Sequence, residues 1–125
     1  LGRASDTFTS KSGEKIYCFD IEAAIRENKN VADCEVVGIP SNGHDIPVAH
    51  IIVRDKCKLS EDELIATIHS NCQQKLSMQA VPCGYKIRKN FPVKDSGKRD
   101  IELIKQDRTD FIVPTCNGIL HGISF

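Results

Sequence analysis

Residues 31–53 read VADCEVVGIPSNGHDIPVAHIIV, and this stretch decides the fold. Over residues 32–36, apolar side chains such as Ala32 alternate with polar ones, and residues 37–39 are apolar without interruption. This pattern is typical of a β-strand. The Pro-Ser-Asn-Gly segment at 40–43 ends this strand, and the β-branched, apolar residues 47–53 predict a second one. Because the connection is short, we expect the two strands to pair antiparallel.

The segments on either side of this strand pair carry local signals of their own. Short β-rich stretches around a polar turn with Gly13 predict a hairpin over residues 7–17. Ser60 and Glu63 form the pattern of a capping box ahead of an apolar stripe, which predicts a helix from residue 61 to about residue 76. The other predicted elements are a helix at 19–28, a third sheet strand at 84–87 and a short helix from residue 99 or 100. We therefore expect an α+β domain with an N-terminal β-hairpin and a small, mainly antiparallel three-stranded sheet, packed on one face by two to three helices.

Composition places the chain among ordinary globular domains. Its 125 residues suffice for one packed domain, and 17 Lys and Arg residues balance 17 Asp and Glu residues. A net charge of zero removes any global attraction to nucleic acid or to anionic lipid, so we expect neither as a partner. No apolar run approaches the roughly 20 residues that cross a bilayer. The chain begins without Met, which leads us to expect a piece of a longer protein.

The six cysteines and the four histidines do not predict a metal site. The cysteines contain no close pair of the kind that zinc sites or redox motifs use. Several occupy apolar positions of predicted elements, so we expect reduced, mostly buried thiols and a cytoplasmic location. His44 and His50 flank Asp45, but no third ligand follows at a useful spacing.

The loop Ser96-Gly97-Lys98 is the most suggestive site that the residues alone offer. A flexible glycine beside a lysine can present a cation to a phosphate or a carboxylate. The loop lacks the earlier glycine of a phosphate-binding P-loop, so by itself it is best interpreted as a solvated turn. The segment Ser12-Gly13-Glu14-Lys15 by itself is likewise a hairpin turn.

Several such segments in a fixed order change this interpretation. They are Gly2-Arg3-Ala4-Ser5-Asp6, Ser12-Gly13-Glu14-Lys15-Ile16-Tyr17, Asp20-Ile21-Glu22, Val36-Val37-Gly38-Ile39-Pro40, Pro47-Val48-Ala49, Leu59-Ser60-Glu61-Asp62-Glu63-Leu64, Val81-Pro82 and Phe91-Pro92-Val93-Lys94-Asp95-Ser96-Gly97-Lys98-Arg99-Asp100. Together they resemble the C-terminal domain of the adenylate-forming enzymes, the AMP-dependent synthetases and ligases that include acyl-CoA synthetases. The resemblance implies a C-terminal small domain over residues 1–107. It leaves residues 108–125 as an extension of unknown role, which could add a strand, contact another domain or mediate self-association.

The resemblance assigns the chemistry of adenylation to Lys98. In the family, a lysine at this place enters the active site of the large domain and contacts the substrate carboxylate and the oxygens around the α-phosphate. A mobile ammonium there aligns two anions and stabilises the charge that builds up during transfer. Gly97 would let the loop pass close to the ligand.

Other roles implied by the resemblance fall near the N-terminus. Asp6 matches the hinge about which the small domain rotates between the two half-reactions, although Ser5 stands at the family's usual distance after Arg3. Arg3 and Lys15 match nucleotide-binding positions, and Lys15 replaces an arginine that many members carry. Three residues would line the pantetheine tunnel during thioester formation: Ser12, Gly13 and Glu14. A Cβ at Gly13 would obstruct this channel.

The resemblance implies the C-terminal lid domain of an ATP-dependent, AMP-forming carboxylate ligase, most simply an acyl-CoA synthetase. Its cofactors would be ATP and Mg²⁺, held mainly by a large N-terminal domain, with CoA or phosphopantetheine as the acceptor. Its partners would be that large domain and the carboxylate substrate, and the small domain alone is expected to be inactive. Two alternatives stay open: the small domain of an adenylation domain that loads a carrier protein, and a stand-alone, non-catalytic binding module.

Overall fold

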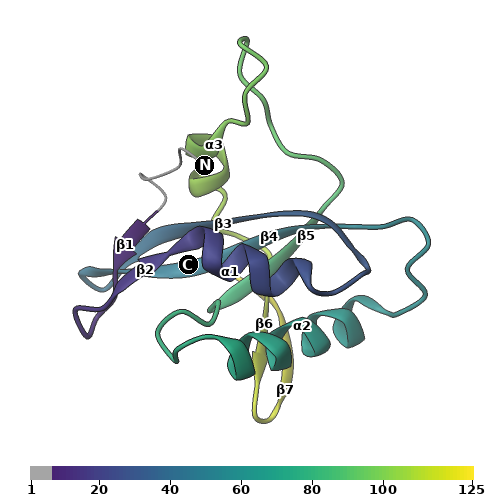
Figure 1. The fold of residues 1–125 in the computed structure, drawn as a ribbon, viewed down its shortest axis with the longest axis horizontal. Coiled ribbons are helices and arrows are strands. Elements are labelled where there is room, and N and C mark those ends of the chain that lie inside the picture. Colours follow the sequence, from purple (N-terminus) through teal and green to yellow (C-terminus); the bar gives the residue numbers. More distant parts are fainter. Residues whose placement is uncertain (1–6) are drawn as a thin grey trace.

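The computed structural model describes residues 7–125, which form a two-stranded hairpin, a five-stranded sheet and three helices (Figure 1). The elements are β1 (Thr7–Thr9), β2 (Lys15–Tyr17), α1 (Cys18–Arg26), β3 (Val31–Ser41), β4 (His44–Val53), α2 (Glu61–Lys75), β5 (Gly84–Arg88), α3 (Ile101–Gln106), β6 (Phe111–Thr115) and β7 (Gly118–Ile123). The α+β class is confirmed, and so is the N-terminal hairpin, in which β1 and β2 pair antiparallel.

The main sheet has five strands in the order β3-β4-β5-β6-β7, so the predicted three-stranded sheet is wrong. The strand pair predicted from residues 31–53 forms as expected, because β3 and β4 run antiparallel around a turn at Asn42 and Gly43. Helix α2 then carries the chain across to β5, which pairs parallel to β4. Strands β6 and β7 come from the extension and add to the far edge of β5, where Tyr85 faces Ile112.

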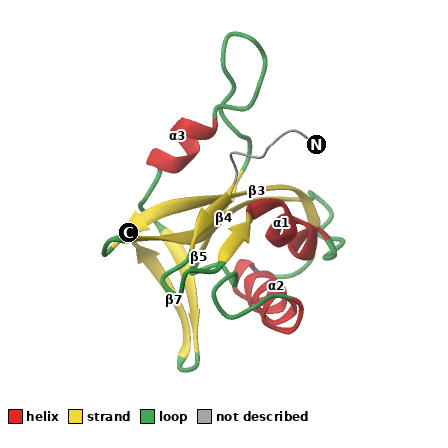
Figure 2. Ribbon diagram, turned by 60° about the vertical axis from the view of Figure 1, so that its left-hand side comes forward, coloured by secondary structure: helices red, strands yellow, loops and turns green. Residues whose placement is uncertain are grey.

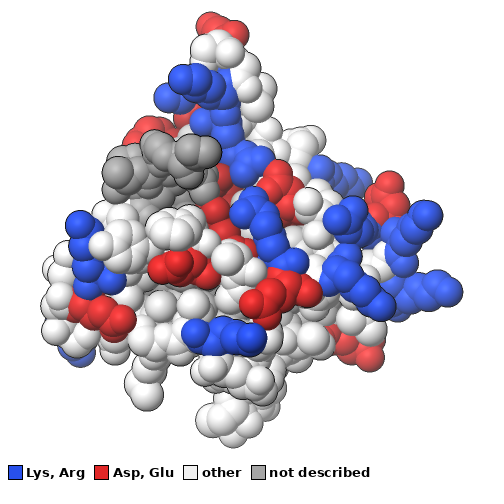
Figure 3. All heavy atoms as spheres, viewed as in Figure 1, with Lys and Arg blue, Asp and Glu red and all other residues white. Residues whose placement is uncertain are grey.

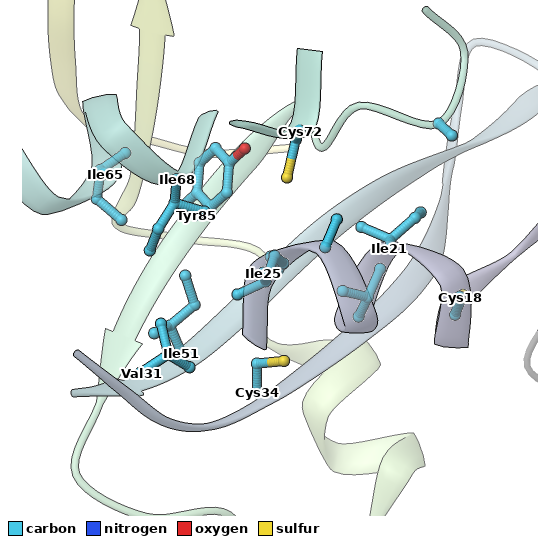
Figure 4. Packing of buried hydrophobic residues seen from close by; sticks show 14 of the residues in the cluster. Cys18, Ile21, Ile25, Val31, Cys34, Ile51, Ile65, Ile68, Cys72 and Tyr85 are labelled. Atoms are coloured by element: carbon cyan, nitrogen blue, oxygen red, sulfur yellow. The ribbon is translucent and has the colours of Figure 1, made fainter. Parts of the chain in front are cut away.

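The helices lie on both faces of the sheet, and not on one face as the sequence suggested (Figure 2). Helices α1 and α2 pack on one face over the larger core cluster, which includes Ile25, Ile68 and Tyr85 (Figure 4). Helix α3 covers the opposite face, where Ile104 is fully buried among side chains of β3, β4 and β6. Both faces of β3 and β4 are therefore buried, which explains their continuous apolar runs.

The first half of β3 differs from the simple alternation that the sequence suggested. The pairing register with β4 shifts between Val31 and Asp33, so Val31 faces the core and Ala32 is exposed. Such a bulge re-aims the side chains on either side of it. Glu35 consequently points at the α3 face of the sheet, where its side chain is fully buried.

The C-terminal extension is part of the packed structure. Phe111 is fully buried and meets the ring of Phe125 edge to face, with 5.3 Å between the ring centroids. The Phe125 ring lies over Gly84 so closely that a Cβ there would be 2.8 Å from it. Just ahead of the extension, Asp107 binds Lys86 and Arg88 of β5, which ties the end of α3 to the sheet.

Two further sequence features can be placed. Cys18, Cys34 and Cys72 are buried free thiols, whereas Cys83 and Cys116 are exposed. The longest helix of residues 7–125 is α2 with 15 residues, and none of the described helices is long and apolar enough to cross a membrane.

Candidate functional site

The segment from Pro92 to Asp100 is a narrow loop that projects from the body of the domain at the top of Figure 1. Its two legs are joined by a β-bridge between Val93 and Arg99 and by a hydrogen bond from the Asp100 N–H to the Pro92 carbonyl. At the tip, the Lys94 N–H donates to the Lys98 carbonyl at 2.7 Å. The loop is thus a small hairpin with a defined shape.

Gly97 gives this hairpin its turn. Its φ of +87° lies in the region that L-residues rarely adopt, and a Cβ built there would meet nothing within 4 Å. Glycine is therefore required by the backbone conformation and not by crowding within the domain. Lys98 follows directly and is exposed. Figure 3 shows basic side chains along this projection and an acidic group at its tip.

Arg99 fastens the base of the loop to the sheet. Its guanidinium binds Glu35 at 2.9 Å and Asp33 at 2.5 Å, both on β3. It also stacks over the ring of Phe91, 4.3 Å from the ring centroid, where the chain enters the loop. Burial alone would lower the pKa of Arg99, but the bonds to Glu35 and Asp33 outweigh burial and raise this pKa above its ordinary value. Arg99 therefore stays charged.

Asp33 is shared between this loop and helix α1. Its carboxylate accepts a hydrogen bond from Arg26 of α1 at 2.8 Å and another from Arg99. Burial would raise the pKa of Asp33, but these two arginines outweigh it and hold the pKa below its usual range. Arg26 also lies 3.7 Å from Glu22, whose other oxygen accepts from the Val36 N–H at 2.9 Å. Glu22 therefore joins α1 to β3.

The β1–β2 hairpin is the second exposed element that the sequence singled out. Gly13 has a φ of +89° at the turn, and a Cβ there would meet nothing within 4 Å. The Ser10 hydroxyl lies 3.1 Å from the Ser12 hydroxyl and accepts from the Glu14 N–H at 3.2 Å. Across the surface, Glu14 accepts a hydrogen bond from Ser77 after α2 at 2.9 Å. The turn is therefore exposed but held in place.

A groove of about 410 Å³ runs beside this hairpin. It lies between β2, α1 and the end of α2, and Lys15, Tyr17 and Leu76 are among its walls. The Lys15 ammonium lies over the Tyr17 ring, 5.7 Å from the centroid. The Lys15 charge thus lies against an aromatic face in the wall of the groove.

The structure does not bring all the predicted site residues together. Ser12, Gly13, Glu14 and Lys15 share the hairpin, whereas Gly97 and Lys98 lie on the separate projecting loop (Figure 1). Arg3 and Asp6 fall outside the described residues.

Sequence reasoning missed the anchor of the projecting loop, formed by Phe91 and Arg99 on the loop and by Asp33 and Glu35 on β3. The one available signal was a pair of carboxylates two residues apart in a strand, which places them on one face. Within residues 7–125, no group of three or more His, Cys, Asp or Glu side chains could hold a metal ion.

Comparison with known proteins gives the family. The AMP-binding enzyme C-terminal domain family matches residues 20–98, which is more than half of the chain. A crotonobetaine/carnitine–CoA ligase of Escherichia coli O8 (strain IAI1) is 32% identical over 89 residues, which are 70% of this chain and 16% of that ligase. The chain belongs to this family, the C-terminal domain of adenylate-forming enzymes, and the predicted resemblance is confirmed.

Solved structures agree with this assignment. An acyl-CoA synthetase of Brucella canis matches with a TM-score of 0.70 and 30% identity, covering 85% of this chain and 19% of that one. A fatty acyl CoA synthetase of Mycobacterium tuberculosis matches with a TM-score of 0.67 over 83% of this chain and 20% of that one, and at 23% identity this likeness concerns the fold. The chain thus spans about a fifth or less of the length of these relatives.

Proposed function

We propose that this chain is the C-terminal lid domain of an ATP-dependent, AMP-forming carboxylate ligase, with Lys98 as its catalytic residue in acyl-adenylate formation. The observation that carries the proposal is the loop of residues 92–100. It holds an exposed lysine away from the domain on a hairpin of defined shape, as a residue that serves a site on another domain must be held. The names of the relatives, which are CoA ligases and acyl-CoA synthetases, support the same reaction.

The chemistry of adenylation suits an exposed, mobile ammonium. Two anions, a carboxylate and the α-phosphate of ATP, must approach each other, and negative charge develops on the oxygens around the phosphorus as pyrophosphate leaves. The Lys98 ammonium would contact both groups, lowering their repulsion and stabilising the transition state. ATP and Mg²⁺ would be held mainly by a large N-terminal domain, which is the first partner of this one.

The second half-reaction is assigned to the hairpin. We propose that the backbone at Ser12, Gly13 and Glu14 lines a tunnel for the pantetheine arm, and the absence of a side chain at Gly13 supports this. Lys15 and Arg3 would contact the nucleotide, and Asp6 would be the hinge. CoA is favoured as the acceptor over a carrier protein because the named relatives are CoA ligases.

The domain limits follow the same proposal. We assign residues 1–107 to the lid domain and residues 108–125 to an extension. The pairing of β6 with β5 supports a stabilising role for this extension.

The test uses the full-length ligase and measures its two half-reactions separately. Lys98→Ala should lower acyl-adenylate formation by about 10²–10³-fold, the usual effect of removing one such contact. Thioester formation from supplied acyl-adenylate should change little. Lys94→Ala is the matched control, because Lys94 is an exposed lysine on the same hairpin and its backbone bonds survive the substitution. Undiminished adenylation by Lys98→Ala would overturn the assignment.

A further inference from the structure

We propose that Arg99 is a positioning residue that fixes the direction of Lys98 by clamping the base of the 92–100 loop to strand β3. The inference rests on the proposed function of Lys98. It goes beyond that function because it assigns a role to Arg99, Asp33, Glu35 and Phe91, which act through the loop and not on the substrate.

The Arg99 side chain joins both legs of the loop to the sheet. Arg99 follows Lys98 directly in the chain and is half-buried, and it contacts both sides of the loop base. Two of its nitrogens bind carboxylates of β3, while its flat face stacks on Phe91 at the entering leg. The entering leg, the leaving leg and the sheet are therefore joined by one side chain.

Beyond its base, the loop is surrounded by solvent. Residues 93–98 are all exposed, and a Cβ at Gly97 would meet nothing within 4 Å. Packing of the tip cannot therefore set the direction in which Lys98 points. The hydrogen bonds within the hairpin join its two legs only to each other. The clamp at the base fixes the angle of the loop to the domain and also holds the two legs together, so that these exposed bonds stay closed.

Charge and burial both favour an arginine at position 99. Glu35 is fully buried beside β4, where a carboxylate requires partners, and Arg99 is one of them. The planar guanidinium fork can reach Glu35 and Asp33 at once and stack on Phe91, whereas an ammonium can do only part of this. Arg26 of α1 holds Asp33 from the other side, so the clamp is braced against a helix.

The test begins with the loop itself, in the 125-residue chain. Arg99→Met should speed amide hydrogen exchange at Lys94 and Asp100, whose N–H groups close the hairpin, by about tenfold. Since Arg99→Met alone could unfold the domain by leaving carboxylates behind, Arg99→Met combined with Glu35→Gln is the second variant. It should show the same loop exchange while exchange in α2 stays as in the wild type. Unchanged exchange at Lys94 and Asp100 in the folded variants would overturn the clamp.

The second readout is catalysis by the full-length ligase. Both Met-containing variants should lower the kcat of adenylation by about tenfold or more, because misplacing the reacting group costs orientation. The KM for ATP and thioester formation from supplied acyl-adenylate should stay near wild type. Arg99→Lys should restore part of the kcat. The control is Lys89→Gln, an exposed cation outside the loop, which should leave both half-reactions unchanged.

The two proposals fail in different ways. If Lys98→Ala leaves adenylation intact, the proposed function fails, and the hydrogen-exchange result still decides whether Arg99 holds the loop. If Lys98→Ala abolishes adenylation but the Arg99 variants adenylate like the wild type, the positioning role of Arg99 fails alone.

Discussion

The buried imidazole of His50 should make this domain less stable as the pH falls below about 6.5. His50 lies in β4 with its side chain fully buried, and neither ring nitrogen has a hydrogen-bond partner among the described residues. Burial is the largest cause, Arg88 and Lys86 act in the same direction and Asp107 opposes them, so that the pKa of His50 is lowered from 6.5 to about 4. Between pH 6.5 and pH 4, His50 is therefore mostly protonated in the unfolded chain and mostly neutral in the folded domain.

The direction and the size of the effect follow from this difference. Between pH 4 and pH 6.5 the unfolded state binds more protons, so the free energy of unfolding rises with pH there and falls as the solution becomes more acidic. The whole shift from 6.5 to about 4 corresponds to about 3 kcal/mol. About 2 kcal/mol of this should be lost between pH 7 and pH 5.

The assay is urea unfolding of the wild type and of His50→Leu at half-unit steps from pH 7.5 to pH 4.5. At pH 7.5 the variant should be at least as stable as the wild type, because leucine buries no unpaired nitrogen. Between pH 7 and pH 5 it should lose about 2 kcal/mol less than the wild type. His44→Gln, at the start of β4, is the matched control and should keep the wild-type dependence. If His50→Leu retains the full acid dependence, this reasoning about the buried imidazole is wrong.

Two further substitutions test the packing and the capping. Gly38→Ala should destabilise the domain by about 1–3 kcal/mol, measured by urea unfolding, because the added Cβ would lie 2.8 Å from the buried Phe8 ring and displace β1. Unchanged stability would show that the hairpin can repack around the added methyl group. Ser60→Ala should lower the free energy of unfolding by about 1 kcal/mol, because it removes the capping box of α2, in which the Ser60 hydroxyl accepts from the Glu63 N–H. Ser70→Ala, on the exposed face of the same helix, is the control and should leave this free energy nearly unchanged.

The elements that the sequence predicted well are those with short-range causes. The capping box at Ser60 and the apolar stripe after it lie within one helix, and α2 forms with both bonds of the box present. The β3–β4 pair is likewise set by a short turn. The pairing of β6 with β5 depends instead on a contact between Tyr85 and Ile112, which are far apart in the sequence. No local sequence pattern predicts such a contact. For that reason the sheet was predicted two strands too small.

The same division separates the parts of the candidate site. Lys98 and Gly97 could be singled out because a family pattern marks them within a few residues. The partners of Arg99 are 64 and 66 positions away on β3, and a bulge near Asp33 decides which way they point. Charged side chains in a strand are usually on a solvated face, so the burial of Glu35 could only come from the structure.

The two exposed loops are parts of one body, and this constrains how the proposed ligase would use them. The hairpin leads directly into α1, α1 holds Asp33 through Arg26, and Asp33 holds the Lys98 loop through Arg99. Bending the Lys98 loop alone toward a ligand would strain the contacts of Arg99 with Asp33 and Glu35, and bending the hairpin alone would strain the hydrogen bond between Ser77 and Glu14. A hinge rotation ahead of the hairpin, at Asp6, would leave all of these pairs intact. If the proposed ligase uses Lys98 and the Gly13 turn in turn at one active site, we therefore expect the whole domain to move, with the Arg26–Asp33–Arg99 contacts linking α1 to the Lys98 loop.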